Sequence, residues 1–386
     1  MRPGRAPSHV LALDGLRGLA ILLVIPHNMN FGAQGIVRVA TFAAGAGWIG
    51  VQLFFVLSGY LITCNLLDTL QSDNYYRVFF ARRILRIVPL YVAFLAFALL
   101  VLPAAGIQAV QYLHNRSDQV WIWIFLVNWA MPFGHNVPGF GHFWSLGVEE
   151  QFYAIWPFVV ARCSRRLAAT CVVIAVVGLV VRATLLAVGA PALAAYTFTV
   201  CRVDALALGA AVAAMVRKPV FSLPARWPAG RLVLAATALL VGGGVITRGY
   251  PAYGAMSLTL GQSLLALAFA LVILAIVTGG AGWWRTMLES APLRSAGKYS
   301  YGMYVLHPLI DTLWQPTLLA ACRWTGAWLP VVYMGLTAAM SFGAAFLSYH
   351  LLEKHFLRMK QLFVPSERQP TQGGRRPLSS PVEYVG

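Results

Sequence analysis

Two adjacent acids, Glu149 and Glu150, interrupt the apolar and aromatic stretch HFWSLGVEEQFYAIWP (142–157). If this stretch is helical, Ser145, Glu149 and Tyr153 share one face, because successive members are four residues apart. A carboxylate on such a polar face can orient and charge a histidine, which is a common general-base arrangement. We therefore predict a role in a functional site for Glu149, with Ser145 and Tyr153 beside it.

Glu150 lies about 100° around the same helix and must meet other neighbours. A buried carboxylate needs a cation, and Arg17 and Arg202 are the candidates. We interpret Glu150 as a structural ion-pair partner that fixes helix register. Arg202 stands two residues before Asp204 in the sequence, and we expect these two residues to form a structural pair.

The first apolar segment carries a candidate base. Asp14 and Arg17 stand at its start, and His27 follows ten residues after Arg17, which is about 15 Å farther along a helix. A proline precedes His27 and Asn28 follows it, a context that favours a polar pocket over a plain core histidine. His27 is therefore our first choice as general base.

Other polar residues in apolar segments allow two interpretations each. Arg82, Arg83 and Arg86 are either ordinary cytoplasmic charge or a phosphate clamp, since arginine makes bidentate contacts to phosphate. Ser58, in FFVLSGYL, is either a hydrogen-bond donor in a site or a small residue of helix packing. Tyr304 and His307 lie in YSYGMYVLHPL, and His307 is the second-choice base.

The composition places these residues in a membrane protein. Of the 386 residues, 59% are hydrophobic and only 11% are charged, and long apolar stretches recur along the chain. The net charge of +17 does not indicate a nucleic-acid-binding protein, because the basic residues cluster between apolar segments. The five cysteines have no CxxC spacing, so we expect neither disulfides nor a metal site.

We expect an all-α polytopic transmembrane bundle of about ten spans, with both termini in the cytoplasm, because arginines concentrate on that side. The first span is expected to be an uncleaved helix, and the Trp-rich stretch 119–133 to be an interfacial or re-entrant segment. Residues 1–360 would form the membrane domain and 361–386 a disordered cytoplasmic tail. The expected spans are 17–33, 47–67, 87–105, 144–161, 167–188, 200–216, 231–248, 257–278, 299–320 and 329–353.

Seven stretches together resemble acyltransferase family 3, the bacterial integral-membrane O-acyltransferases. They are, in order, LDGLRGLAILLVIPH, GVQLFFVLSGYLI, FFARRILRIVPLY, FWSLGVEEQFYAIWP, RVDALALG, YSYGMYVLHPL and SYHLLEKHF. The resemblance covers nearly all of the chain from Leu13 to Phe356. It implies that an acyl group moves from cytoplasmic acyl-coenzyme A, the donor substrate, to a hydroxyl, usually of a sugar.

The resemblance also implies roles for individual residues. His27 would be the catalytic histidine with Arg17 as its partner, and the acids Glu149 and Glu150 would belong to the family signature. Arg82, Arg83 and Arg86 would bind the donor. One departure concerns the spacing: family members commonly place the histidine eleven residues after the arginine, whereas here the spacing is ten, which leaves the two side chains about 80° apart on a regular helix.

We expect His27, polarised by Glu149, to take the proton of an acceptor hydroxyl, with Arg17, Ser58 or Asn28 stabilising the oxyanion. An acyl-histidine intermediate is the alternative route. The acyl group is expected to be acetyl. The acceptor would be a surface polysaccharide or glycolipid outside a bacterial cytoplasmic (inner) membrane, with the segment 119–143 involved in its choice. A glycosylated secondary metabolite as acceptor, and a glycolipid transporter or flippase, are the alternatives.

Overall fold

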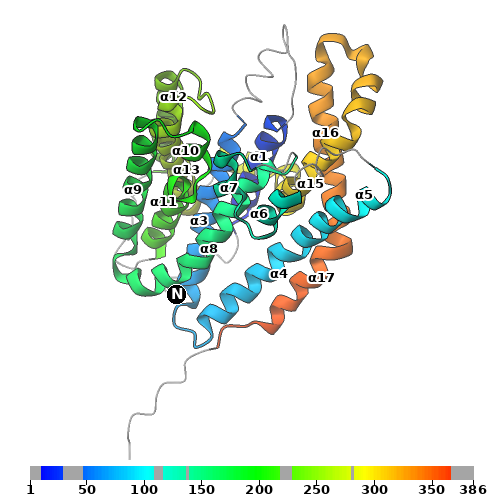
Figure 1. Cartoon of the computed structure of the whole chain (residues 1–386). Helices are drawn as coiled ribbons and strands as arrows, with labels where there is room; N and C mark the ends of the chain where they lie inside the picture. The colour runs from blue at the N-terminus through cyan, green and yellow to red at the C-terminus, as the bar shows by residue number, and fades with distance from the viewer. Residues whose placement is uncertain are drawn as a thin grey trace, which may run out of the picture.

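The computed structural model describes residues 10–28, 47–107, 116–135, 139–217, 228–279 and 282–366. Within these ranges the chain is helical and contains no β-strand, which confirms the all-α prediction (Figure 1). The end of the first expected span (29–33) and most of the expected tail (367–386) lie outside the described residues.

The long helices number ten in the described chain. They are α1 (Leu11–His27), α3 (Ile49–Thr69), α4 (Tyr75–Ala96), α8 (Trp144–Cys163), α9 (Leu167–Ala187), α11 (Thr199–Arg217), α12 (Ala229–Thr247), α13 (Gln262–Thr278), α15 (Ala291–Ala321) and α16 (Leu329–Ser348). The shorter α-helices are α5 (Leu102–Ala104), α6 (Gln119–Trp123), α7 (Val127–Ala130), α10 (Ala192–Thr197), α14 (Trp283–Leu288) and α17 (Lys354–Arg358). Their apolar faces form one continuous core.

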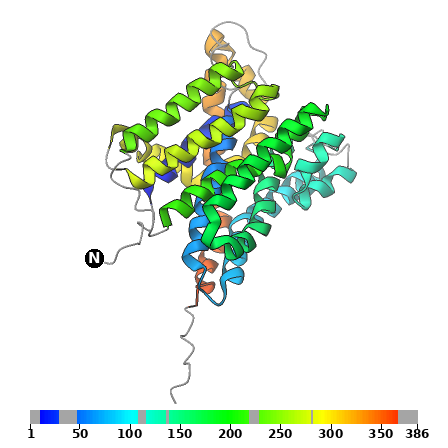
Figure 2. The same ribbon diagram turned by 90° about the vertical axis from the view of Figure 1, so that its left-hand side faces the viewer.

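The long helices pack in a chain of neighbours that differs from their order in the sequence. Helix α9 packs on α11, α11 on α3, α3 on α1, α1 on α15, and α15 on α16. Helices α12 and α13 cover one side of this series, as Figure 2 shows. The series brings the first helix of the chain against one of the last, so that residues nearly 300 positions apart can share a site.

Glycines set the close contact between α1 and α15. A Cβ atom on Gly18 would lie 2.0 Å from the backbone oxygen of Leu293, and one on Gly297 would lie 1.9 Å from the backbone oxygen of Asp14. Real side chains cannot approach so closely, whereas small residues let membrane helices pack backbone to backbone. The same device joins α3 to α11, at Gly59 and Gly209. These contacts place Arg17 of α1 beside the first turns of α15.

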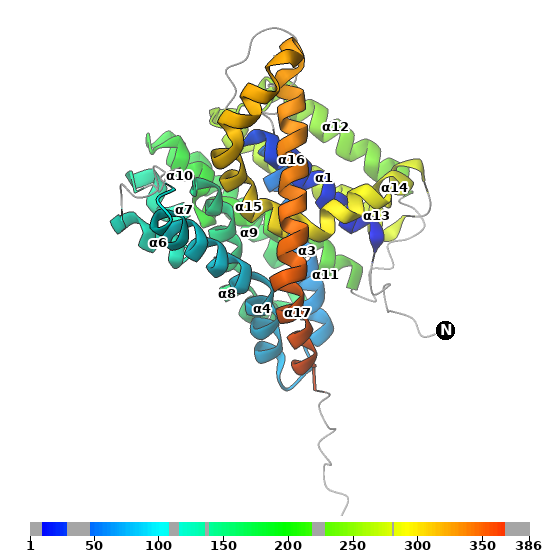
Figure 3. The ribbon, with the colours of Figure 1, turned by 90° about the vertical axis from the view of Figure 1, so that its right-hand side faces the viewer.

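Helix α4 begins at Tyr75, twelve residues before the expected span 87–105. Its arginines therefore project from the helix itself and not from the loop before it. Figure 3 shows α4 beside the long rod that α16 forms with α17, which are joined by a π-helical turn at Tyr349–Glu353.

The chain beyond α17 is bound to the start of α4. The side chain of Asn74 donates to the carbonyl of Val364 at 2.9 Å and accepts from the backbone N–H of Ser366 at 3.0 Å. Residues 361–366, which the sequence assigned to the tail, are thus held by hydrogen bonds, and only the remainder of that tail lies outside the described residues.

Seven helical segments of the described chain are long and apolar enough to cross a membrane. They are Ile49–Thr69, Tyr75–Ala104, Gly141–Ala187, Ala192–Arg217, Ala229–Thr247, Ser257–Thr278 and Leu329–Leu362. Eight of the ten expected spans fall in these segments, because Gly141–Ala187 contains both α8 and α9. The two others correspond to α1, of which 17 residues are helical, and to α15. The protein is a multi-pass membrane protein, and the count of ten and the orientation of its ends stay predictions.

The Trp-rich stretch contains no helix long enough to cross a membrane. The five-residue α6 and the four-residue α7 are separated by Phe125, whose φ of 58° breaks the helix. Ile122 and Val127 are nevertheless buried against the bundle. This arrangement agrees with the prediction of a segment that lies against the bundle without spanning.

Candidate functional site

Five helices, α1, α3, α4, α8 and α15, surround a cavity of about 830 Å³, part of it open to solvent. We call it the Glu149 cavity. Its polar lining residues are Arg17, Ser58, Arg83, Arg86, Ser145, Glu149, Tyr153, Ser300, Tyr301 and Tyr304. The structure thus brings together eight predicted site residues from five separate sequence stretches. Ser300 and Tyr301 were not singled out from the sequence, although they lie in the stretch that supplied Tyr304.

Glu149 is the carboxylate of this cavity. Its Oε1 accepts a hydrogen bond from the hydroxyl of Ser58 at 2.8 Å, and its Oε2 accepts one from the hydroxyl of Tyr153 at 2.8 Å. Tyr153 follows one turn later on α8, as the spacing predicted, whereas Ser58 comes from α3. Both donors favour the ionised carboxylate and fix its orientation.

Three arginines line the same cavity as this carboxylate. Arg17, Arg83 and Arg86 line the cavity, and none of them forms an ion pair within 4.0 Å with a carboxylate of the described chain. The guanidinium of Arg83 lies over the ring of Tyr153, 5.4 Å from its centroid. Arginines without a carboxylate partner can receive an anionic ligand. Arg82 lines neither cavity, and its Nε donates to the carbonyl of Phe363 at 2.9 Å.

A second cavity of about 950 Å³, part of it open to solvent, adjoins the first, and we call it the Lys298 cavity. It is lined by Asp14, Arg17, Arg86, Ala291, Arg294, Ser295, Lys298 and Tyr349. Arg17 and Arg86 line both cavities. No sequence motif marks Arg294 and Lys298 as site residues, because basic residues between apolar segments are typical of the cytoplasmic side of a membrane protein.

Hydrogen bonds connect Ser145 and Tyr304, two residues of the Glu149 cavity, to the backbone of His142. The hydroxyl of Tyr304 donates to the carbonyl of His142, so the hydroxyl of Ser145, 2.6 Å away, must be the donor to Tyr304. The ring of His142 lies 5.4 Å from that of His307 and is buried, and neither of its nitrogens has a hydrogen-bond partner in the described chain.

His307, the second-choice base, is tied to its surroundings through both ring nitrogens. Its Nδ1 lies 2.9 Å from the carbonyl of Tyr304, so Nδ1 carries the proton. Its Nε2 then accepts from the side chain of Asn28 at 3.1 Å. His307 is buried and does not line the Glu149 cavity. The lone pair on Nε2 of His307 therefore accepts the hydrogen bond from Asn28, the residue that follows His27.

Helix α1 continues without a break through Pro26 to His27, its last residue. His27 is half-buried and lies ten residues beyond Arg17, a spacing that separates two side chains by about 80° on a regular helix. The catalytic role of His27 and its partnership with Glu149 stay predictions. Among the described residues no group of three or more metal-ligating side chains could hold a metal ion.

Residues 10–350 match the model of a family described as an acyltransferase domain. The chain belongs to this acyltransferase family. The resemblance based on the seven sequence stretches is thereby confirmed. No solved structure matches the chain.

Curated relatives of this acyltransferase are longer proteins. YrhL of Bacillus subtilis (strain 168), whose name suggests a peptidoglycan O-acetyltransferase, is 30% identical over 384 residues, covering 90% of this chain and 54% of YrhL. OatA of Listeria monocytogenes, named a peptidoglycan O-acetyltransferase, is 35% identical over 160 residues, covering 39% of this chain and 24% of OatA. The O-acetyltransferase OatA of Staphylococcus aureus (strain NCTC 8325) is 32% identical over 174 residues, covering 40% of this chain and 25% of its own. The chain therefore spans about half the length of YrhL and about a quarter of each OatA.

Two of the expected ion pairs are wrong in this acyltransferase. Arg202 is fully buried among Phe55, Trp144 and Tyr196, with its guanidinium 5.3 to 5.4 Å from each ring centroid. None of its nitrogens has a hydrogen-bond partner among the described residues. Cation–π attraction stabilises the charge there in place of a carboxylate. Glu150 pairs with neither Arg202 nor Arg17, and its buried Oε1 has no partner in the described chain.

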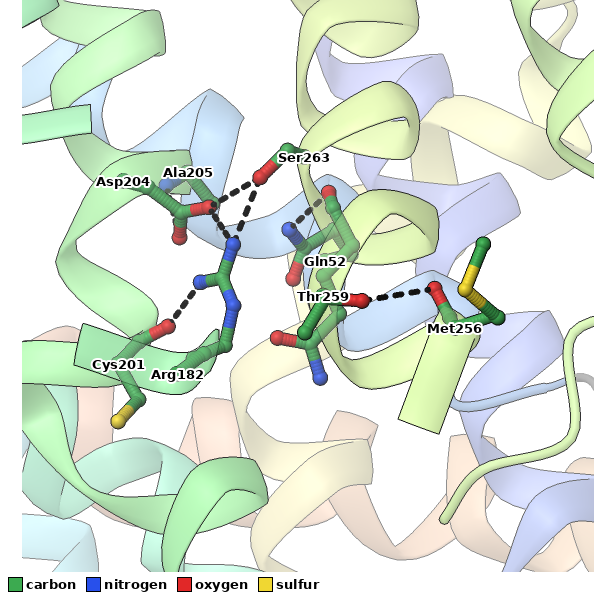
Figure 4. A network of polar contacts seen from close by, with 9 residues as sticks. Gln52, Arg182, Cys201, Asp204, Ala205, Met256, Thr259 and Ser263 are labelled. Atoms are coloured by element: carbon green, nitrogen blue, oxygen red, sulfur yellow. Dashed lines mark hydrogen bonds and ion pairs between the residues drawn. The ribbon is translucent and has the colours of Figure 1, made fainter. Parts of the chain in front are cut away.

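The partner of Asp204 is Arg182 of α9 and not Arg202. Arg182 Nη2 lies 2.7 Å from Asp204 Oδ2 and donates to Ser263 of α13 at the same distance, and Nη1 donates to the carbonyl of Cys201 (Figure 4). Residues two apart on a helix point to different sides, which explains why Arg202 and Asp204 do not meet. The pair is fully buried and ties three helices together, away from the Glu149 cavity.

Proposed function

We propose that the protein is a membrane O-acetyltransferase that moves an acetyl group from acetyl-coenzyme A to a hydroxyl of a cell-envelope glycan. The observation that carries the proposal is the Glu149 cavity, where a carboxylate held by Ser58 and Tyr153 faces arginines without carboxylate partners. In a chain of the acyltransferase family, such a cavity fits an anionic thioester donor and a site of acyl transfer. The membrane would be the bacterial cytoplasmic membrane.

In the proposed reaction His27 acts as the general base. It takes the proton from the acceptor hydroxyl while the hydroxyl oxygen attacks the thioester carbonyl carbon. The resulting tetrahedral intermediate collapses, the C–S bond breaks, and the coenzyme A thiolate leaves and takes up the proton. Ser58 or Asn28 would stabilise the negative charge that develops on the carbonyl oxygen, and Glu149 would balance the positive charge on the histidine.

The relatives' names support a choice of acceptor. YrhL and the listerial OatA are named for peptidoglycan, whose sugars carry free hydroxyls. We infer a cell-wall glycan as acceptor, reached from the outer side of the membrane.

The test is mass spectrometry of surface glycans and glycolipids from cells with the wild-type protein, with His27→Ala, or without the protein. We expect an acetyl-sized mass increase with the wild type alone. His355→Ala is the control, because His355 is an exposed histidine on α17, outside both cavities. An increase that persists with His27→Ala would reject the base assignment. No increase with well-expressed wild type would reject the envelope-glycan acceptor.

A further inference from the structure

We propose that the Lys298 cavity is the phosphate subsite for the acyl donor: Arg294 and Lys298 hold the phosphates of coenzyme A, and its pantetheine arm passes between Arg17 and Arg86 into the Glu149 cavity. The inference rests on the proposed function and specifies where its donor binds. It adds two residues that neither the sequence motifs nor the family resemblance indicated.

The geometry of the two cavities supports this path. Arg17 and Arg86 belong to the walls of both, so they stand where one cavity meets the other. The carboxylate of Glu149 lies on the far side of that junction, and Lys298 lies on the near side. A ligand with an anionic end and a long neutral arm could occupy both cavities at once.

The charges in the Lys298 cavity favour a phosphorylated ligand. Four cationic side chains line this cavity: Arg17, Arg86, Arg294 and Lys298. Among its described lining residues, the carboxylate is Asp14. None of the four forms an ion pair with a carboxylate of the described chain. Coenzyme A carries a diphosphate and a ribose phosphate, and guanidinium and ammonium groups bind phosphate through charge-assisted hydrogen bonds.

One face of α15 connects the two cavities. Arg294, Lys298 and Tyr301 are spaced i, i+4 and i+7, so they share this face. Arg294 and Lys298 line the Lys298 cavity, and Tyr301 lines the Glu149 cavity. The hydroxyl of Tyr301 donates to the carbonyl of Ile87 at 2.7 Å, which fixes this face of α15 against the turn of α4 that carries Arg86. From Arg294 to Tyr301 the face extends about 10 Å.

The experiment measures coenzyme A binding to the purified, detergent-solubilised full chain. The test variant is Arg294→Gln/Lys298→Gln, and the control is Arg77→Gln/Arg358→Gln, which removes two exposed positive charges outside both cavities. We expect the test variant to bind coenzyme A about tenfold more weakly or worse, and the control to bind it like wild type. Pantetheine, which lacks the phosphates, should bind the test variant and wild type equally.

Several outcomes overturn the inference, each in a different way. If wild type binds coenzyme A and the test variant keeps that affinity, the phosphate subsite is wrong and the donor class stands. If wild type does not bind coenzyme A, the proposed function itself fails. If native mass spectrometry shows that the test variant loses bound phosphatidylglycerol while its affinity for coenzyme A is unchanged, the cavity holds a lipid phosphate. Should the double variant unfold, Lys298→Gln alone repeats the test, because Lys298 is exposed.

Discussion

At the scale of residues, the Glu149 carboxylate is fixed from two helices. Tyr153, one turn further along α8, holds one oxygen, and Ser58 of α3 holds the other. The first contact could be predicted from the sequence, because helical spacing determines it. The second could not, since no spacing within one helix reveals which neighbouring helix packs against it.

We expect Glu149→Gln to lower acetyl transfer strongly, because an amide presents one acceptor atom and places a donor where Ser58 or Tyr153 already donates. Tyr153→Phe should lower the rate by about tenfold, the value of one hydrogen bond to a charged group. The rates would be measured as acetylated glycan formed per amount of protein. Tyr76→Phe, at an exposed tyrosine, is the control, and equal losses in both tyrosine variants would contradict the assignment.

The buried pair of Arg182 and Asp204 allows a prediction about stability. Asp204→Leu leaves a buried guanidinium without its carboxylate and should lower the free energy of unfolding by about 3–5 kcal/mol. The double variant Arg182→Met/Asp204→Leu removes both charges and should recover much of that loss. The stabilities of the single and the double variant would be compared with that of the wild type by thermal unfolding in detergent. A double variant less stable than the single one would show that the charges themselves stabilise the bundle.

At the scale of elements, the backbone contact between α1 and α15 places Arg17 in the wall of the Lys298 cavity, beside Arg294 and Lys298. Gly18 and Gly297 allow it, and neither would draw notice in a sequence with 35 glycines. The apolar runs of the sequence predict that the helices exist. They do not predict where α4 begins, because its first turns carry arginines, which are also typical of loops between membrane spans. The amphipathic start of a membrane helix does not follow from hydropathy alone.

Gly297→Ala should push α15 away from α1, since its Cβ would lie 1.9 Å from a backbone oxygen. We expect a loss of about 1–3 kcal/mol or more of stability, together with weaker coenzyme A binding. Gly343→Ala on α16 is the matched control, because its Cβ would have no neighbour within 4 Å. Melting temperature and binding would both be compared, and a stable, binding-competent Gly297→Ala would disprove the close contact.

At the scale of the whole molecule, family and membrane class could be predicted from the sequence, whereas the arrangement of the cavities could not. Helices α1 and α15 meet although their residues are nearly 300 positions apart, and only the fold determines that contact. The proposed entry of the donor from the cytoplasm also depends on the predicted orientation, in which α17 and the start of α15 lie on the cytoplasmic side.

That orientation predicts opposite labelling at the two ends of α16. In a variant without native cysteines, Trp324→Cys should react with a membrane-impermeant maleimide in intact spheroplasts. His355→Cys should react only in inverted vesicles. Both positions are exposed, so accessibility within the fold does not limit either reaction. Labelling of both from one side would mean that α16 does not cross the membrane, and reversed labelling would place the Lys298 cavity outside the cell.

The hydrogen bonds after α17 have a practical consequence for anyone who shortens the protein. The carbonyls of Phe363 and Val364 are bound by Arg82 and Asn74, at the beginning of the helix that also carries Arg83 and Arg86. A chain cut after Leu362 would lose both acceptors and release Arg82 to compete for the same anions as its neighbours. A cut after Ser366 keeps these contacts, so purification tags and fusion partners should be attached from that residue onward.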